Sequence, residues 1–199
     1  MLYNTEWIYF RKMRKEFKFT LSNQQLNNFL LTFKTELNVL HEPNKIKSIY
    51  YDTDYFEIYK ASISKDINKF KYRIREYNGN SRYYREIKMS QNQKLKFTKE
   101  DQYLNIYPEQ IFFKQYNLKS KSIVDFNREY FKFFQSRLTI DTNIIYSHLK
   151  NNVKFTEQYN IVEMKLHNQV FTDIERFLPF NPGKFSKFES SISNIYLAN

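Results

Sequence analysis

Residues 70–77 read Phe70-Lys71-Tyr72-Arg73-Ile74-Arg75-Glu76-Tyr77, and the first six positions alternate between aromatic or aliphatic side chains and basic ones. Because successive side chains of a β-strand point to opposite faces, this pattern predicts a strand with Arg73 and Arg75 on the same face. The dipeptide Asn78-Gly79, which is typical of tight hairpin turns, comes next, and a second alternating segment follows at residues 83–89. The stretch therefore predicts a β-hairpin with a row of cationic side chains on one face.

The same two-residue period recurs along the chain and predicts about eight strands. The predicted strands cover residues 14–21, 46–52, 70–77, 83–89, 94–98, 131–134, 136–141 and 159–166. Helical periodicity is less common and predicts helices over residues 23–37, 99–105, 109–118, 171–178 and 187–196. Without a linker or an internal repeat, residues 1–199 are expected to form a single α+β domain that consists mainly of antiparallel sheet.

The composition excludes several classes of protein. The chain has 199 residues with two glycines and no cysteine, which excludes glycine-rich phosphate loops, disulfide frameworks and thiolate chemistry. No apolar run approaches the ~18 residues of a membrane-spanning helix, and the N-terminus lacks the pattern of a signal peptide. We therefore expect a cytoplasmic protein without a membrane segment. The net charge of +11 indicates an anionic partner.

Charged residues occupy alternate positions in the predicted strands, so they share faces. The pattern Glu-x-Lys occurs three times, and five of the nine arginines lie in or beside predicted strands: Arg14, Arg73, Arg75, Arg128 and Arg137. An antiparallel sheet with its polar face in water would explain this alternation. If the sheet instead closes with these faces inward, its lumen is a cationic channel with carboxylates. Such a channel suits a polyanion and a hard cation such as Mg²⁺ or Mn²⁺.

Eight segments of the chain resemble, in the same order, the motifs of the vacuolar transporter chaperone (VTC) polyphosphate polymerase domain, a family within the CYTH-like triphosphate tunnel metalloenzymes. The similar segments are Arg-Lys-Glu-Phe-Lys (14–18), Ile-Tyr-Tyr-Asp-Thr (49–53), Lys-Tyr-Arg-Ile-Arg-Glu-Tyr (71–77), Arg-Glu-Ile-Lys (85–88), Val-Asp-Phe-Asn-Arg-Glu-Tyr (124–130), Arg-Leu-Thr-Ile-Asp-Thr (137–142), Ile-Val-Glu-Met-Lys (161–165) and Phe-Ser-Lys-Phe (185–188). The resemblance implies an antiparallel eight-stranded β-barrel, the triphosphate tunnel, with flanking helices. It also implies transfer of the γ-phosphate of ATP to a growing inorganic polyphosphate chain.

The resemblance also implies roles for individual residues. Phosphate-binding roles are implied for Lys18, Arg73, Arg75, Lys88, Arg128, Arg137, Lys184 and Lys187, of which Arg73, Arg75, Arg137 and Lys187 are expected to act on the transferred group. Glu163 is implied as the main metal ligand, most often for Mn²⁺. Glu16 is a second metal candidate that could instead orient Lys18, and Lys165 is a further phosphate candidate. Asp141 is either a site residue or a buried partner of Arg137.

Two other functions stay open. The first is a tunnel hydrolase that cleaves tripolyphosphate or a nucleoside triphosphate, with almost the same fold and site. The second is a non-catalytic polyanion or nucleic-acid binder. The chain has no RNA-binding aromatic signature and no helix-turn-helix pattern, so we do not expect a nucleic-acid partner. The sequence predicts neither the residues that contact adenine nor the oligomeric state.

Overall fold

The computed structural model describes residues 15–64, 69–91, 95–104, 106–134, 136–166 and 181–197. The strands in these ranges are β1 (Lys15–Leu21), β2 (Leu37–Asp52), β3 (Lys69–Tyr77), β4 (Tyr83–Gln91), β5 (Leu95–Leu104), β6 (Gln110–Phe113), β7 (Tyr116–Phe133), β8 (Ser136–His148), β9 (Lys154–Thr156) and β10 (Asn160–Leu166). The helices are α1 (Asn23–Thr32), α2 (Glu57–Ile63) and α4 (Lys187–Ile192), which continues into the π-helical turn η1 (Ser193–Leu197).

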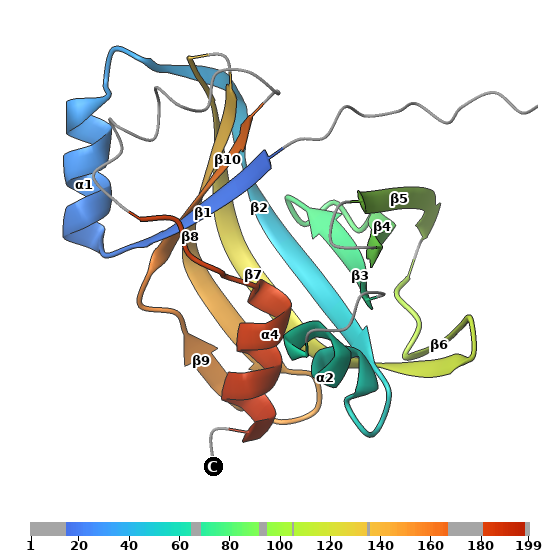
Figure 1. Cartoon of the computed structure of the whole chain (residues 1–199). Helices are drawn as coiled ribbons and strands as arrows, with labels where there is room; N and C mark the ends of the chain where they lie inside the picture. Colours follow the sequence, from blue (N-terminus) through green and yellow to red (C-terminus); the bar gives the residue numbers. More distant parts are fainter. Residues whose placement is uncertain are drawn as a thin grey trace, which may run out of the picture.

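All the strands belong to one antiparallel sheet. Eight of them follow the order β1-β10-β8-β7-β2-β3-β4-β5, while β6 pairs with β7 and β9 pairs with β8. The long strands β2, β7 and β8 run side by side and curve together (Figure 1). Register shifts interrupt the pairing of β7 with β2 and with β8, and such irregularities increase the local bend of a strand. The sheet therefore has a concave face, which we call the inner face.

The predicted hairpin between β3 and β4 is confirmed. The two strands pair from Lys69 with Ser90 to Glu76 with Tyr83. In the turn, Asn78 has φ 55° and Gly79 has φ 64°. Asparagine and glycine are the residues that most readily adopt this left-handed conformation, which explains why the Asn-Gly dipeptide marks the turn.

Helix α1 covers the outer face of one half of the sheet (Figure 1). Its start is fixed by a capping box, in which Ser22 Oγ accepts from Gln25 N at 3.2 Å and Gln25 Oε1 accepts from Ser22 N at 2.9 Å. Leu26 and Phe29 then pack against apolar side chains of β1, β7, β8 and β10. On β1, these are Phe19 and Leu21, so the alternate positions are left for the inner face.

Helices α2 and α4 lie together at the opposite end of the molecule (Figure 1). Asp52, at the end of β2, holds the start of α2, because its carboxylate accepts from the backbone N–H groups of Ile58 and Tyr59, both at 2.9 Å. Helix α4 is joined to β7 by a hydrogen bond of 2.7 Å between the hydroxyls of Ser191 and Ser122. This packing fixes where α4 meets the inner face.

The C-terminal segment connects β1, at one end of the strand order, with β3. In the described ranges, no ladder pairs β1 with β5, the two ends of the strand order. Instead, Gly183 N donates to Lys18 O of β1 at 2.8 Å. A few residues later, Ser186 Oγ and Glu189 Oε1 each accept from Lys71 Nζ of β3 at 2.7 Å. The segment therefore links β1 to β3 and helps to close the space over the inner face.

Two predicted helices are wrong. Residues 99–104 of the helix predicted over 99–105 lie in β5, which pairs with β4 along its length, so that long-range pairing overrides a weak local preference. Residue 105 lies outside the described residues. The helix predicted over residues 109–118 is instead β6 and the start of β7, joined at Lys114, whose φ of 54° breaks a right-handed helix. The helix predicted over 171–178 and residue Arg14 lie outside the described residues.

Other boundaries differ from the predictions. Helix α1 ends at Thr32 instead of residue 37, β2 begins nine residues before the predicted residue 46, and the predicted strand at 131–134 is the end of the long β7. Helix α2 and strand β9 were not predicted. Within the described ranges, the helices are too short or too polar to cross a membrane.

We expect Phe29→Ala to destabilise the fold by ~3–5 kcal/mol. Phe29 is 2% exposed, and its ring lies 5.1 Å from that of Phe33 and 6.0 Å from that of Phe133, so the truncation leaves a cavity between α1 and the sheet. Urea denaturation measures the loss. The matched control is Leu31→Ala on the same helix, because Leu31 is 74% exposed and its removal should change the free energy of unfolding by less than about 0.5 kcal/mol. Equal effects of the two substitutions would contradict this packing.

Candidate active site

The charged faces of the strands meet on the inner face. On one side, Lys18 of β1 lies opposite Glu163 of β10. On the other side, Arg73 of β3 lies opposite Glu86 of β4. The two sides come into contact where Lys88 Nζ of β4 lies 3.4 Å from Glu16 Oε1 of β1. These strands are first and seventh in the strand order, so the contact crosses the lumen. The charged faces therefore line a tunnel.

An arginine pair lies on β3 and is held by Glu86. Arg73 Nε donates to Glu86 Oε2 at 2.6 Å, and Arg75 Nη1 lies 3.6 Å from Glu86 Oε1. Arg73 also donates to the hydroxyl of Tyr50 at 3.2 Å, and Arg75 donates to Ser48 Oγ at 3.0 Å. Burial raises the pKa of Glu86, but the charges of Arg73 and Arg75 outweigh this effect and lower the pKa to about 2. Glu86 is therefore ionised at neutral pH.

A second cluster joins β7, β8 and α4 around Asp141. Arg128 Nε lies 2.5 Å from Asp141 Oδ1, and Arg128 Nη2 lies 2.7 Å from Oδ2. Lys187 Nζ contacts the same Oδ2 at 2.5 Å. Burial raises the pKa of Asp141, but the charges of Arg128 and Lys187 lower it to about 2. Asp141 is thus a buried partner of basic residues, which was one of the two predicted alternatives. Its partners are Arg128 and Lys187, however, and not Arg137.

The two clusters meet at one aromatic ring. The ring of Phe126 has Lys187 Nζ at 4.7 Å, Arg128 Cζ at 5.3 Å and Arg75 Cζ at 6.0 Å from its centroid. The electron-rich face of an aromatic ring attracts cations at such distances. Phe126 therefore helps to hold three cationic groups close together, although they come from β3, β7 and α4.

Two carboxylates and three lysines form the third group. Lys18 Nζ lies 3.2 Å from Glu16 Oε1 and 3.8 Å from Glu163 Oε2. Lys165 Nζ lies 2.9 Å from Glu163 Oε1, and Lys88 contacts Glu16. Burial acts to raise the pKa of Glu163, but Lys165, Lys18 and Arg128 lower it well below its usual range. Both carboxylates are therefore available as anionic ligands.

Glu16 and Glu163 fit a hard divalent cation. Burial and the charge of Glu163 both act to raise the pKa of Glu16, and the charges of Lys88, Lys18 and Lys165 lower it overall. A divalent cation bound by these carboxylates would relieve the repulsion between them. Within the described ranges, no three His, Asp or Glu side chains converge on a metal-sized site. The donor set therefore fits Mg²⁺ or Mn²⁺ bound by one or two carboxylates, with substrate oxygens and water completing the shell, and not an all-protein cage.

The structure brings most of the predicted site residues together. The predicted residues that lie in these clusters are Lys18, Arg73, Arg75, Lys88, Arg128, Lys165, Lys187, Glu16 and Glu163. Two predicted residues lie apart from them. Arg137 follows the inner-face alternation of β8 but is exposed, and Lys184 is exposed just before α4.

Two inner-face residues were missed. Lys71 binds Ser186 and Glu189 of the C-terminal segment, and Tyr50 binds Arg73. The signal for Lys71 was present, because it is two residues before Arg73 in the alternating stretch. For Tyr50 there was no such signal, because an aromatic residue in a strand normally indicates the core.

The tunnel lining has an excess of positive charge. Among the described residues, the ion pairs of the inner face involve eight cations and five carboxylates: Lys18, Lys71, Arg73, Arg75, Lys88, Arg128, Lys165 and Lys187, with Glu16, Glu86, Asp141, Glu163 and Glu189. Burial raises the pKa of Tyr50, but the charges of Arg73 and Arg75 outweigh this effect and lower it to about 8. A buried phenol ionises this readily only in a positive potential, so the lumen is suited to an anion.

We expect Tyr50 to ionise near pH 8, which can be followed by the ultraviolet absorbance of tyrosinate. Because its pKa lies below the usual value of 10.0, ionisation stabilises the folded state, and the free energy of unfolding should rise between about pH 8 and 10. Tyr50→Phe should remove both the early titration step and this rise. Tyr55→Phe, at a position that is 77% exposed, should keep both. Titration of every tyrosine at or above pH 10 would contradict the positive potential.

The fold is shared with proteins of known structure. HpAC1 from Hippeastrum, an adenylyl cyclase candidate described as having a dominant triphosphatase activity, is 14% identical with a TM-score of 0.56, over 93% of this chain and 98% of that chain. A protein of Pyrococcus horikoshii OT3 is 13% identical with a TM-score of 0.53, over 93% of this chain and 99% of that chain. At these identities the similarity shows the fold alone, which is the CYTH-like tunnel fold.

A search of curated proteins finds no match to this sequence. The family model of the VTC domain, by contrast, matches residues 13–111 and 90–196. The two matches together include all the described strands and helix α4, and thus the three clusters of the inner face. The expected family is confirmed: this chain belongs to the VTC domain family.

Proposed function

We propose that this protein is a metal-dependent polyphosphate polymerase, which transfers the γ-phosphate of ATP to the end of an inorganic polyphosphate chain. The observation that carries the proposal is the excess of cations over carboxylates inside the tunnel, together with the lowered pKa of Tyr50. Membership of the VTC domain family supports it. ATP and inorganic polyphosphate are the proposed partners, and we place the reaction in the cytoplasm, where ATP is available.

Phosphoryl transfer requires positioning and charge neutralisation more than it requires a protein nucleophile. Arg73 is held by Glu86 and Tyr50, yet 24% of its side chain is exposed, so it keeps donors for phosphate oxygens. Arg128 and Lys187 are held by Asp141 and lie beside the ring of Phe126. These cations are oriented before substrate binds, which is the arrangement that stabilises charge in a transition state.

In this proposal, Glu163 and Glu16 hold Mn²⁺ or Mg²⁺, which supplies charge neutralisation on phosphate oxygens when bound. The lysines that pair with these carboxylates in the structure, Lys18, Lys88 and Lys165, would then bind the polyphosphate. Arg137 and Lys184 are exposed, and we assign them to the approach of the polyanion.

A tunnel hydrolase is the second candidate. The dominant triphosphatase activity described for HpAC1, which shares this fold, favours it. The inner-face clusters would serve both reactions, because the difference lies in the acceptor, which is polyphosphate in one case and water in the other.

The reaction products separate the two functions. After incubation with ATP and Mn²⁺, we expect ADP and long-chain polyphosphate, resolved by gel electrophoresis. Release of orthophosphate without polymer would establish the hydrolase instead. Arg137→Ala should fold normally, because the side chain is exposed, and should raise the KM for polyphosphate by about tenfold with little change in kcat, as expected for a residue that acts on the approach of the polyanion. Lys154→Ala, an exposed position on β9, is the charge-matched control and should keep full activity.

The role of Glu163 can be tested by its metal response. Because Glu163→Gln removes an anionic ligand, we expect the Mn²⁺ concentration for half-maximal activity to rise by about tenfold or more, or ~1.4 kcal/mol. Binding of tripolyphosphate without metal should be kept, as measured by calorimetry. Glu109→Gln, at an exposed position, is the control and should change neither quantity. An unchanged Mn²⁺ response in Glu163→Gln would remove the residue from the metal site.

A further inference from the structure

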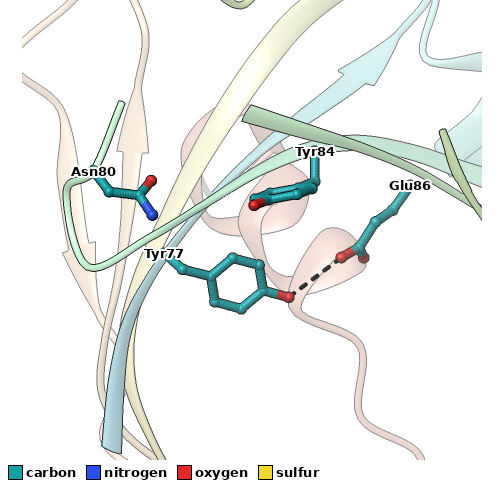
Figure 2. Close-up of a pocket in the computed structure, with 4 residues that line it drawn as sticks. All are labelled: Tyr77, Asn80, Tyr84 and Glu86. Carbon is teal, nitrogen blue, oxygen red and sulfur yellow. Dashed lines mark hydrogen bonds between the residues drawn. The ribbon is translucent and has the colours of Figure 1, made fainter. Parts of the chain in front are cut away.

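A cavity of about 260 Å³ lies at the β3–β4 hairpin and is lined by Tyr77, Asn80, Tyr84 and Glu86 (Figure 2). Cavities that hold whole drug-sized ligands measure roughly 300–1,000 Å³. The cavity therefore has room for one ring system of a larger ligand.

Two tyrosines give the cavity aromatic walls. The ring centroids of Tyr77 and Tyr84 are 5.9 Å apart, and their planes are inclined by 70°. A flat ring that stacks on one tyrosine would thus meet the other tyrosine edge to face. Stacked and edge-to-face arrangements of aromatic rings are both favourable. Tyr77 is itself held in place, because its hydroxyl lies 3.5 Å from Glu86 Oε1 and the guanidinium of Arg75 lies 5.9 Å from its ring centroid.

Asn80 supplies hydrogen-bonding groups at the rim of the cavity. Its Oδ1 accepts from the backbone N–H of Arg82 at 2.9 Å, which orients the amide. The Nδ2 group is on the cavity side (Figure 2) and is a donor only. It therefore suits a ring nitrogen or a carbonyl oxygen at the edge of a heterocycle.

The inner wall of the cavity is formed by Glu86, which adjoins the arginine pair. The ionised carboxylate of Glu86 pairs with two cations, Arg73 and Arg75, so its charge is taken up by the arginine pair and the cavity itself offers mainly aromatic and amide groups. The same carboxylate contacts Arg73 and Arg75, which attract phosphate just beyond it. A ligand that fits both environments has an uncharged aromatic ring at one end and phosphates at the other.

We propose that this cavity is the nucleobase subsite of the tunnel: it binds the base of a nucleoside triphosphate through Tyr77, Tyr84 and Asn80, while Arg73 and Arg75 bind its phosphates. The inference rests on the proposed function, and it adds the place at which the nucleotide is recognised. It also gives the direction of the substrate, with the base at the hairpin and the phosphates toward Phe126 and the cations around it.

Calorimetry with two probes tests the subsite without catalysis. The probes are a non-hydrolysable ATP analogue and inorganic tripolyphosphate, each titrated into the intact protein. We expect Tyr84→Ala to weaken binding of the ATP analogue by about tenfold, or ~1.4 kcal/mol. Asn80→Ala should weaken binding of the analogue by about threefold. Tripolyphosphate binding should stay within about twofold in both variants. Tyr84→Phe keeps the ring and should restore the affinity for the analogue.

The matched control is Tyr55→Ala, at an exposed aromatic position outside the cavity. This variant should bind both probes with the wild-type affinity. Because Asn80 is exposed in the hairpin turn, its variant tests the subsite even if Tyr84→Ala does not fold. Equal weakening of both probes, or no weakening of the analogue, would overturn the subsite and leave the proposed function standing. Binding of neither probe by the wild-type protein would overturn both.

Discussion

Two buried carboxylates, Glu86 and Asp141, hold the cationic lining of the tunnel in place. Each binds two cations at once: Arg73 and Arg75 in one case, Arg128 and Lys187 in the other. A buried cation without a partner is costly, and removal of one partner from a buried pair destabilises a protein strongly. The carboxylates therefore allow the protein to gather cations from β3, β7 and α4 in one lumen without unfolding.

The closure of the tunnel and the construction of the site depend on the same segment. Residues 183–189 connect β1 to β3 through Gly183, Ser186 and Glu189, and Lys187 lies within this segment. A change that loosens the C-terminal segment would thus open the tunnel and also remove one of the cations around Phe126. A substitution in this segment is therefore expected to affect both the fold and the site.

Two regions of the tunnel lining differ in their side chains. Around Phe126 the cations outnumber the carboxylate, and the lowered pKa of the nearby Tyr50 is consistent with a positive potential there. At the hairpin, Glu86 separates the arginine pair from a cavity that is lined by two tyrosines. Phosphates are favoured in the first region because of its cations, and an uncharged ring is favoured in the second because its walls are aromatic.

The sequence by itself determined which residues share a face. The two-residue period of a strand is a local property, so the alternation of residues 70–77 was sufficient to place Arg73 and Arg75 side by side. Local preference was a poor guide at residues 99–105 and 109–118, where pairing with β4 and β7 decided the structure. Only the tertiary structure decided the partners of the charges. Asp141 binds Lys187 across 46 positions of sequence, because curvature of the sheet and docking of α4 bring them together, and no local pattern encodes that contact.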